Sequence, residues 1–563
     1  MTSPERERAV AFVVARLDSS RFPAKQFRLV GARSILDRIF DSLNKCGELD
    51  LAVLATVAEP ANERLRDFAN NREIPLFWYE GDPDHVTTRL ARAGEAFHAS
   101  ICLLISADCP LIDPASVDAL IRRMREVPEA DYLTTPPLAP DRSLLLEGVQ
   151  VARLKAWVRA DALSDRPELK EHQFPVIYRS PGLFVKAEAT LDEAVYGPHH
   201  RMSVDTWADL EFMETLHTRL TAADLPFDLP HAVGLMNGDP SVGEINAHVH
   251  QRKLLEDIRK VLIIADAGGP YGYGHFMRCR ELAGQLVERA SWPVTFLVDD
   301  EAAARMALDC GFHTLWGALG RTAAPPPDGV EVVSPGKAAV GHGLVLADIS
   351  AQRSPPPGWE KQFPPGMPLV AMDREDDFAN GADLIIIPGI TGRAGTRSGG
   401  PRIVGGSDRA ILRREVRRYK PLSFNKELDI LAYLHLPEQR LALEKVSEIN
   451  GWNTIILSGF VEDFPKLLAK ARIFLSGYGI SFYEALHLNA LPVAWPLSPL
   501  HRADAEGFYR AYDLTPLCVS DSQGLSDVLA PLLAGPMPKF MDIVDGTPSL
   551  VEELVALARN KGL

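Results

Sequence analysis

The chain has 563 residues, more than a single hydrophobic core usually spans, so we expect two to four domains. Hydrophobic residues make up 46% and charged residues 24% of the chain, which is ordinary for a soluble globular protein. The formal net charge of −15 disfavours non-specific binding to nucleic acid, so a phosphate site must be a local cluster of positive charge.

The cysteines and the amino terminus favour a cytoplasmic protein. Six cysteines are scattered along the chain without C-x-x-C or zinc spacing, which is typical of reduced thiols. The first ten residues, MTSPERERAV, carry charges of both signs and no apolar signal segment. No apolar run approaches the roughly 18–20 residues of a membrane span.

The first half of the chain alternates short apolar runs with helical patterns. Helical spacing appears at residues 34–43 and 62–70. The alternation predicts an α/β fold with a mostly parallel sheet and helices on its faces. The strand-like runs are residues 9–17, 51–56, 76–79 and 101–107.

The first strand-like run leads into a basic loop, ARLDSSRFPAK, at residues 15–25. Three positive charges and two hydroxyls in so short a span suit a polyphosphate. A loop at the carboxyl end of a first strand is also where open α/β sheets bind ligands. A basic surface loop with a proline turn is the alternative. The side chains concerned are Arg16, Ser19, Ser20, Arg21 and Lys25.

The loop resembles the nucleotide-binding motif of sugar cytidylyltransferases, in which A-R-x-x-S-[ST]-R-[LF]-P-x-K grips CTP. The resemblance is to the spore-coat polysaccharide and CMP-nonulosonic-acid type, and it extends from about residue 9 to about residue 251. Ala24 stands where glycine is usual. The later motifs, in the expected order, are SADCPLIDP at 106–114, RMSVDTWADLEF at 201–212 and NAHVHQ at 246–251.

This resemblance implies a nucleotidyltransferase domain that uses Mg²⁺. It assigns Asp108 and Asp205 to the metal, and Arg16 and Lys25 to catalysis as well as to phosphate binding. The implied reaction is attack by a hydroxyl of a nonulosonic acid on the α-phosphate of CTP, with release of pyrophosphate. Arg89, in HVTTRLARA, matches a position near the acceptor substrate, and a solvated helix arginine is the alternative. A homodimer through this domain is a further hypothesis.

The second half of the chain contains two further α/β series. A polar, helical pattern at residues 245–260 predicts a connecting helix, and a new apolar strand begins at residue 261. We predict domains at residues 1–255, 256–420 and 421–563, the last two being Rossmann-like lobes. The expected strands are residues 294–300, 344–349, 369–373 and 384–388 in one lobe, and 429–436, 454–460, 472–477, 491–495 and 517–520 in the other.

A glycine-rich segment, GGPYGYGHFMRC at residues 268–279, lies between a predicted strand and a predicted helix. Glycines in this position let the backbone approach a phosphate or a sugar, so Gly272 and Gly274 are candidate substrate contacts. His275 lies at the junction and is a candidate general base near neutral pH. A structural role is the usual alternative for a lone histidine.

The segment resembles the G-x-G-H-x-M-R-C motif of UDP-sugar hydrolases of the pseudaminic and legionaminic acid pathways. These enzymes share the two-lobed GT-B architecture of the glycosyltransferase that makes lipid II. The resemblance implies that His275 activates water against the anomeric carbon of a UDP-linked diacetamido sugar, with Asp266 matching a strand-end aspartate of the catalytic set. The residues 476–484, SGYGISFYE, resemble the diphosphate and uridine loop. Its implied nucleotide contacts are Gly477, Gly479, Ser481 and Glu484.

Three hypotheses follow for the whole chain. The first is a bifunctional enzyme of nonulosonic acid biosynthesis, which binds CTP, a nonulosonic acid and a UDP-sugar. The second replaces the hydrolase by a GT-B glycosyltransferase, which differs only in the nucleophile that reaches the anomeric carbon. The third makes the second half a non-catalytic module that binds a nucleotide-sugar. It is favoured by the lack of a second glycine-rich loop after residues 429–432.

Overall fold

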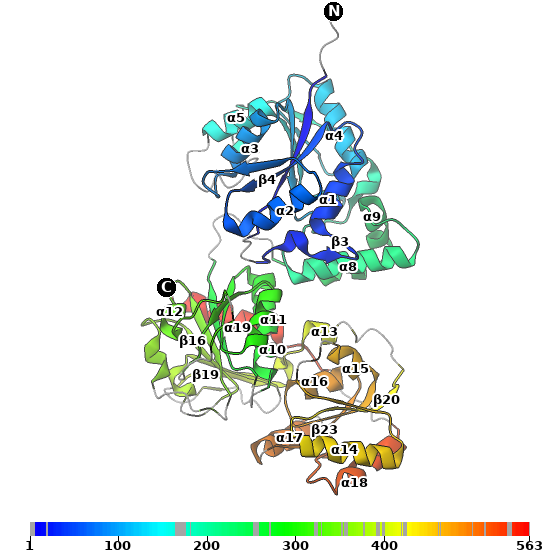
Figure 1. Cartoon of the computed structure of the whole chain (residues 1–563), viewed down its shortest axis with the longest axis vertical. Coiled ribbons are helices and arrows are strands. Elements are labelled where there is room, and N and C mark those ends of the chain that lie inside the picture. Colours follow the sequence, from blue (N-terminus) through cyan, green and yellow to red (C-terminus); the bar gives the residue numbers. More distant parts are fainter. Residues whose placement is uncertain are drawn as a thin grey trace, which may run out of the picture. The chain divides into compact units, whose positions relative to one another are not determined.

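A computed structural model divides the chain into two units, Met1–Val249 and His250–Leu563. Each unit contains its own sheets and its own hydrophobic cores, so we describe each by itself (Figure 1). The structure describes all residues except 1–5, 18–20, 164–175, 179, 181, 251–257, 269–271, 320–324, 328, 351–352, 354–357, 375, 377, 390–394, 397–399, 418, 420–424, 460, 462, 498, 512–513, 537–542 and 562–563.

The first unit is built on a seven-stranded mixed sheet, as the alternation of strands and helices predicted. Its strand order is β10-β7-β9-β6-β1-β4-β5. The strands β5, β4, β1 and β6 are parallel, whereas β9 runs antiparallel to β6 and to β7. The bounds are β1 (Ala9–Val14), β4 (Leu51–Val57), β5 (Leu76–Tyr79), β6 (Ile101–Ser106), β7 (Tyr132–Thr134), β9 (Val149–Arg153) and β10 (Lys186–Glu188).

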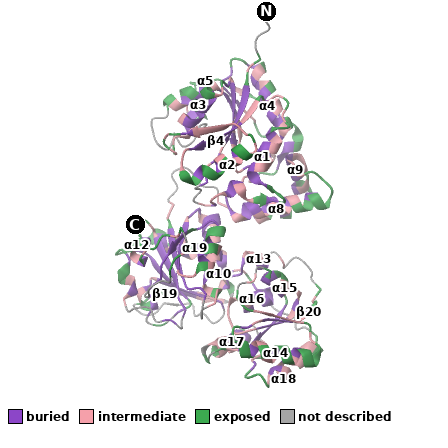
Figure 2. Ribbon diagram, in the orientation of Figure 1, coloured by how far each residue is buried: buried purple, intermediate pink, exposed green. Residues whose placement is uncertain are grey.

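Helices cover both faces of this sheet. The residues of β1 alternate between two cores, because successive side chains of a strand point to opposite faces. Ala11 and Val13 belong to one core, and Val10 and Phe12 to the other. Figure 2 shows these strands as buried and the outer helix faces as exposed. The helices are α1 (Ile35–Leu43), α2 (Glu63–Asn71), α3 (Val86–Ala96), α4 (Pro114–Glu126), α5 (Leu154–Leu163), α8 (Trp207–Ala222) and α9 (Leu229–Gly238).

The second unit contains two sheets, as the two strand series predicted. The larger has eight strands in the order β14-β13-β12-β15-β16-β17-β19-β18, all parallel except for the pairing of β18 with β19. The bounds are β12 (Val261–Ala265), β13 (Val294–Val298), β14 (His313–Trp316), β15 (Leu344–Asp348), β16 (Leu369–Met372), β17 (Leu384–Pro388), β18 (Gly395–Thr396) and β19 (Arg402–Gly406).

The smaller sheet is parallel, in the order β21-β20-β22-β23. Its strands are β20 (Leu428–Tyr433), β21 (Thr454–Leu457), β22 (Ala471–Ser476) and β23 (Leu491–Ala494). The helices of the unit are α10 (Gly274–Ala290), α11 (Glu301–Asp309), α12 (Pro335–Ala338), α13 (Arg414–Arg417), α14 (Pro437–Asn450), α15 (Phe464–Lys470), α16 (Ile480–His487), α17 (Pro499–Ala511), α18 (Leu525–Ala534) and α19 (Thr547–Asn560).

The last helix returns to the larger sheet. In Figure 1 the red α19 lies among the green elements of that sheet. Its apolar side chains Leu550, Val551 and Leu554 are buried in the core that also holds Leu282 and Leu286 of α10. The core of the larger sheet is therefore completed by the carboxyl-terminal part of the chain.

Two predicted elements differ from the structure where it can be compared. The connecting helix predicted at residues 245–260 is not formed at residues 246–250 or 258–260, and the middle of the range, residues 251–257, lies outside the described residues. A 3-10 helix, Pro240–Ile245, ends at the first residue of the predicted range. The strand predicted at residues 517–520 is reduced to an isolated bridge between Ala494 and Cys518.

In the described part of the chain, none of the helices has the length and apolar character that a membrane span requires.

Candidate functional site

The basic loop of the first unit lies where the strand order reverses. From β1 the chain proceeds to β4 and β5 on one side and then returns to β6 on the other side of β1. Such a switch point leaves a crevice at the carboxyl ends of the two central strands. Lys25 follows β1 and Asp108 follows β6, so the fold delivers both side chains to this crevice.

Lys25 joins the two aspartates that the sequence assigned to a metal. Its ammonium lies 2.5 Å from Asp108 Oδ2 and also contacts Asp205 Oδ1. Burial would lower the pKa of Lys25, but the two carboxylates outweigh burial and raise it above its ordinary value. The structure therefore brings Lys25, Asp108 and Asp205 together as a charged cluster, although 180 residues separate Lys25 from Asp205.

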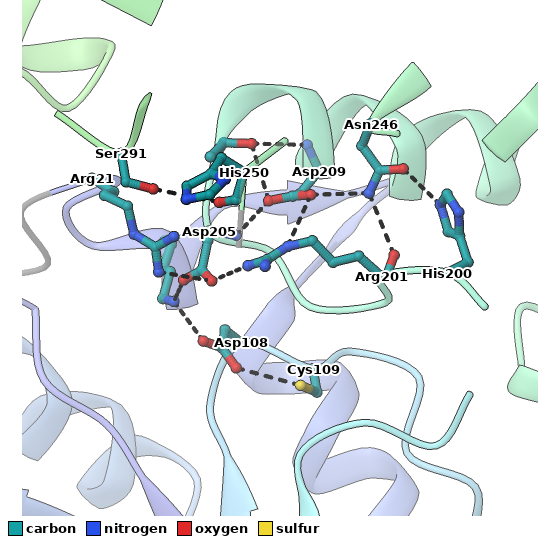
Figure 3. A network of polar contacts seen from close by, with 12 residues as sticks. Arg21, Asp108, Cys109, His200, Arg201, Asp205, Asp209, Asn246, His250 and Ser291 are labelled. Atoms are coloured by element: carbon teal, nitrogen blue, oxygen red, sulfur yellow. Dashed lines mark hydrogen bonds and ion pairs between the residues drawn. The ribbon is translucent and has the colours of Figure 1, made fainter. Parts of the chain in front are cut away.

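Asp205 is surrounded by three positive charges. Besides Lys25, it pairs with Arg21 at 3.0 Å and with Arg201 (Figure 3). Burial would raise the pKa of Asp205, but Lys25, Arg21 and Arg201 lower it well below its usual range. The sequence did not single out Arg201, although it lies in the quoted RMSVD segment.

Asp209 supports the loop that carries Asp205. It is fully buried, and its Oδ2 accepts a hydrogen bond from the backbone N–H of Asp205 at 3.0 Å. Its other oxygen accepts from Asn246 Nδ2 at 2.9 Å, and the Asn246 side chain in turn contacts His200 (Figure 3). The NAHVHQ segment thus contributes Asn246 as a support for the loop that carries Asp205.

The remaining predicted residues of the first unit are placed as follows. Arg16 pairs with Asp84 at 3.1 Å, and its side chain is more than a third exposed. Ser19 and Ser20 lie outside the described residues. Arg89 is buried and is not the solvated helix arginine that was the alternative. Ala24, just before Lys25, adopts a left-handed conformation with φ 51° and ψ 27°.

A cavity of about 540 Å³ opens beside the end of β6. It lies over β6, β9 and β7, on the side of β1 that is opposite to β4 and β5. Several polar groups accompany its leucines, so it can take a ligand of mixed polarity. These polar residues are Ser106, Thr134, Thr135, Gln150 and Tyr178.

The second unit places His275 against a carboxylate at the end of a strand. His275 Nδ1 lies 2.7 Å from Oδ1 of Asp348, the last residue of β15. Arg278 donates to both oxygens of Asp348, at 2.6 and 2.7 Å, and also pairs with Asp373 at 2.8 Å. Burial would raise the pKa of Asp348, but Arg278 and His275 lower it below its usual range.

Asp348 and Arg278 are thus site residues that the sequence analysis missed. The sequence chose Asp266, whose carboxylate instead accepts from the backbone N–H of Ser350 at 2.9 Å and pairs with Arg353. Asp266 therefore holds the segment after β15, and the carboxylate beside His275 is that of Asp348. The sequence pattern that could have identified Asp348 is the one that identified Asp266, a single aspartate at the end of an apolar strand.

The predicted nucleotide loop of the second unit surrounds the start of α16. Gly477 and Gly479 precede this helix, and Ser481 lies in its first turn. Glu484 is fully buried and accepts two hydrogen bonds from Arg413, at 2.6 and 2.5 Å. A ribose would therefore reach Glu484 only if this ion pair opened. Gly272 and Gly274 lie just before and at the start of α10, and a side chain at Gly274 would enter open space.

Among the described residues, no group of three or more histidines, cysteines or acidic residues is arranged to hold a metal. Asp108 and Asp205 provide two carboxylates at one place. This donor set fits Mg²⁺, which takes one or two carboxylates and completes its shell with phosphate oxygens and water.

Known proteins match mainly the first unit. Residues 10–223 match the family model described as Cytidylyltransferase, so the chain has an amino-terminal domain of the cytidylyltransferase type. Spore coat polysaccharide biosynthesis protein SpsF of Bacillus subtilis is 25% identical over 238 residues, covering 41% of this chain and 95% of SpsF. The 3-deoxy-manno-octulosonate cytidylyltransferase of Chlamydia pneumoniae is 26% identical over 139 residues, covering 24% of this chain and 53% of that enzyme. The solved structure of Acinetobacter baumannii MurG is 12% identical with a TM-score of 0.33, covering 53% of this chain and 99% of MurG.

Proposed function

We propose that the first unit is a CTP-dependent cytidylyltransferase that activates a sugar acid of the nonulosonic type. The observation that carries the proposal is the cluster of Lys25, Asp108 and Asp205 at the switch point of the sheet. The match of residues 10–223 to cytidylyltransferases supports the nucleotide, and the names of the relatives support a sugar-like acceptor.

In the proposed reaction a sugar hydroxyl attacks the α-phosphorus of CTP. A new P–O bond forms to the sugar oxygen, which gives its proton to solvent, while the bond to the β-phosphate breaks and pyrophosphate leaves. Lys25, Arg21 and Arg16 hold the phosphates and offset the charge that develops on them. Asp108 and Asp205 would hold Mg²⁺, which supplies further positive charge to the phosphate oxygens.

The acceptor sugar occupies the cavity beside β6 in this proposal. The cavity begins at Ser106, two residues before Asp108, so a ligand there would meet the α-phosphate at the metal position. Thr134, Thr135 and Gln150 offer hydroxyl and amide groups that suit the hydroxyls of a sugar.

The test is a direct assay of both substrates. The protein is incubated with CTP, Mg²⁺ and a panel of ulosonic acids, and phosphorus NMR follows the appearance of pyrophosphate and of a CMP-sugar diester. The Asp108→Asn variant should lose pyrophosphate release while its circular dichroism stays that of the wild type. An Asp108→Asn variant that keeps most of its activity would contradict the metal assignment.

For the second unit we propose a two-lobed, GT-B-like hydrolase of a UDP-linked diacetamido sugar. The pairing of His275 with Asp348 favours catalysis over simple binding. We assign the proton of His275 to Nδ1, which donates to the Asp348 carboxylate at 2.7 Å, a shorter contact than the 3.0 Å between the same nitrogen and Arg278 Nη2. Nε2 is then the nitrogen that takes a proton from water.

The competing functions of the second unit differ in what they release. A hydrolase forms UDP and a free sugar without an added acceptor, a glycosyltransferase needs an acceptor, and a binding module forms no UDP.

The proposal also includes the boundaries 1–255, 256–420 and 421–563, a cytoplasmic location and a homodimer through the first domain. Size-exclusion chromatography with light scattering, at several protein concentrations, tests the dimer.

A further inference from the structure

One peptide unit of the basic loop is held on both sides by buried side-chain amides. The unit joins Arg16 to Leu17. Its carbonyl accepts a hydrogen bond from Gln26 Nε2 at 3.0 Å, and its N–H donates to Asn62 Oδ1 at 2.9 Å. Gln26 is only 3% and Asn62 only 1% exposed. Rotation of this peptide would break both hydrogen bonds away from water, which costs free energy, so the two amides fix its orientation.

Asn62 departs from the usual role of its position. It is the N-cap residue of α2, where an asparagine oxygen normally accepts a hydrogen bond from the first turn of the helix. Among the described residues its side chain makes no such bond, and the oxygen accepts from Leu17 instead. Its Nδ2 donates to the carbonyl of Val57, the last residue of β4, at 3.2 Å and so sets the orientation of the amide. A local preference of the helix is given up for the loop, and such departures are expected at functional sites.

The same contacts tie the start of the loop to its end. The backbone N–H of Ala24 donates to the carbonyl of Leu17 at 3.0 Å, and the Leu17 side chain is buried in the core. Gln26 directly follows Lys25, the residue that joins the two aspartates. The position of Arg16 is therefore linked, through Gln26, to the position of the charged cluster.

The side chain of Arg16 is held more weakly than its backbone. It pairs with Asp84 at 3.1 Å, and the two side chains are 37% and 64% exposed. Ion pairs that are this exposed contribute little to stability, so Arg16 can exchange Asp84 for a phosphate group. The backbone of Arg16, and with it the clamped peptide, then decides where the guanidinium can reach.

We propose that Gln26 and Asn62 are positioning residues, which fix the Arg16–Leu17 peptide so that Arg16 meets the phosphates of CTP in the reactive geometry. The inference rests on the proposed cytidylyltransferase function of the same site. A cation that is already in place needs no reorientation when charge develops on the phosphates, so the two amides act mainly on the rate of the chemical step. In this role neither amide touches the nucleotide.

The experiment measures kcat and the KM for CTP in pyrophosphate release by the full chain, with Mg²⁺ and a ulosonic acid that the wild type turns over. Gln26→Met and Asn62→Leu each remove one of the two bonds and keep a similar volume. Each should lower kcat about 10- to 100-fold and change KM less than about 3-fold. In an Arg16→Met background the same substitutions should lower kcat further by less than about 3-fold, because they act through Arg16. The control is Ile121→Val in the buried face of α4, which lowers stability and should leave both constants unchanged.

Hydrogen exchange of the Leu17 amide in the nucleotide-free full chain gives a second readout, which does not depend on turnover. The amide should exchange at least about 10-fold faster in both variants than in the wild type.

Four results would overturn the inference and leave the proposed function intact. Unchanged exchange of the Leu17 amide would show that the two side chains do not hold the peptide. A raised KM with unchanged kcat would indicate lost affinity, and an equal loss of kcat with and without Arg16 would show an effect that bypasses Arg16. Failure of both variants to fold would make the amides structural. A wild type that releases no pyrophosphate from CTP with any ulosonic acid would overturn the proposed function as well.

Discussion

Replacing Lys25 by methionine tests the charged cluster most directly. The change removes the ammonium between Asp108 and Asp205 and keeps an unbranched side chain of similar length. Removing one partner of a buried ion pair costs about 3–5 kcal/mol. Asp205 retains Arg21 and Arg201, and about a fifth of the Asp108 side chain is exposed, so we expect about 3 kcal/mol, the low end of this range.

The pH dependence of this loss has a definite sign. In the wild type the lowered pKa of Asp205 contributes stability above about pH 4, its ordinary range, and the contribution is lost only as pH falls through the lower folded value. In Lys25→Met, Asp205 protonates more readily, because it has lost one of the three cations that lower its pKa. The deficit of the variant should therefore shrink as pH falls below about 4.

Hydrogen exchange of the β1 amides in the full chain measures this stability without assuming that both units unfold together. Pyrophosphate release from CTP should fall by at least about 10²-fold in the same variant. The control is Lys186→Met, which removes an exposed pair with Glu188 and should change stability by less than about 0.5 kcal/mol. Wild-type protection of β1 in Lys25→Met, or a deficit that does not change at low pH, would refute the reasoning.

Three further predictions follow from single residues. Ala24→Gly should stabilise β1 by about 1 kcal/mol in hydrogen exchange, because Ala24 is left-handed, and an unchanged value would show that the strain is absent. His275→Asn should abolish UDP release, and Asp348→Asn should lower UDP release about 10²-fold, with substrate binding retained in both variants. If neither substitution changed UDP release, His275 and Asp348 would have no part in catalysis. Burial and nearby Asp373 raise the pKa of Asp504 to about 6, so the folded protein favours its neutral form and loses stability as pH rises from about 4 to 6. In hydrogen exchange, Asp504→Asn should therefore stabilise α17 by about 1 kcal/mol at pH 8, a value that is reduced because Asp504 is partly exposed, and should have no effect at pH 4. An equal stabilisation of α17 at both pH values would contradict this reasoning.

The sequence allowed the main layers of the fold to be predicted because local patterns set them. Apolar runs of five to six residues, such as residues 9–14 and 101–106, became central strands. The helix predicted at residues 245–260 is not formed at residues 246–250 or 258–260, because helical spacing alone is a weak signal. The antiparallel direction of β9 was also beyond reach, since a single strand has no local mark of direction.

Lys25, Asp108 and Asp205 could be chosen from the sequence because each lies in one of three motifs of the family that the chain resembles, although these motifs are far apart in the chain. The choice between Asp266 and Asp348 depended on sheet register, which the sequence does not reveal. Asp348 is paired with Ala265, the last residue of β12, so Asp266 lies one residue beyond the end of that strand. Adjacent positions in neighbouring strands send their side chains to opposite faces, and only one face carries α10 and His275. The strand-end pattern was therefore correct, but the face could not be assigned.

The return of α19 to the larger sheet has a consequence for synthesis of the protein. The first unit can complete its core soon after residue 249 is made, because its strands and helices are all encoded before that point. The sheet that begins at Val261 must wait for Leu550, Val551 and Leu554, nearly 300 residues later. At roughly 5–20 residues per second, this leaves its α10 face uncovered for about 15–60 s on the ribosome. During that interval the nascent chain exposes apolar surface that a chaperone can recognise.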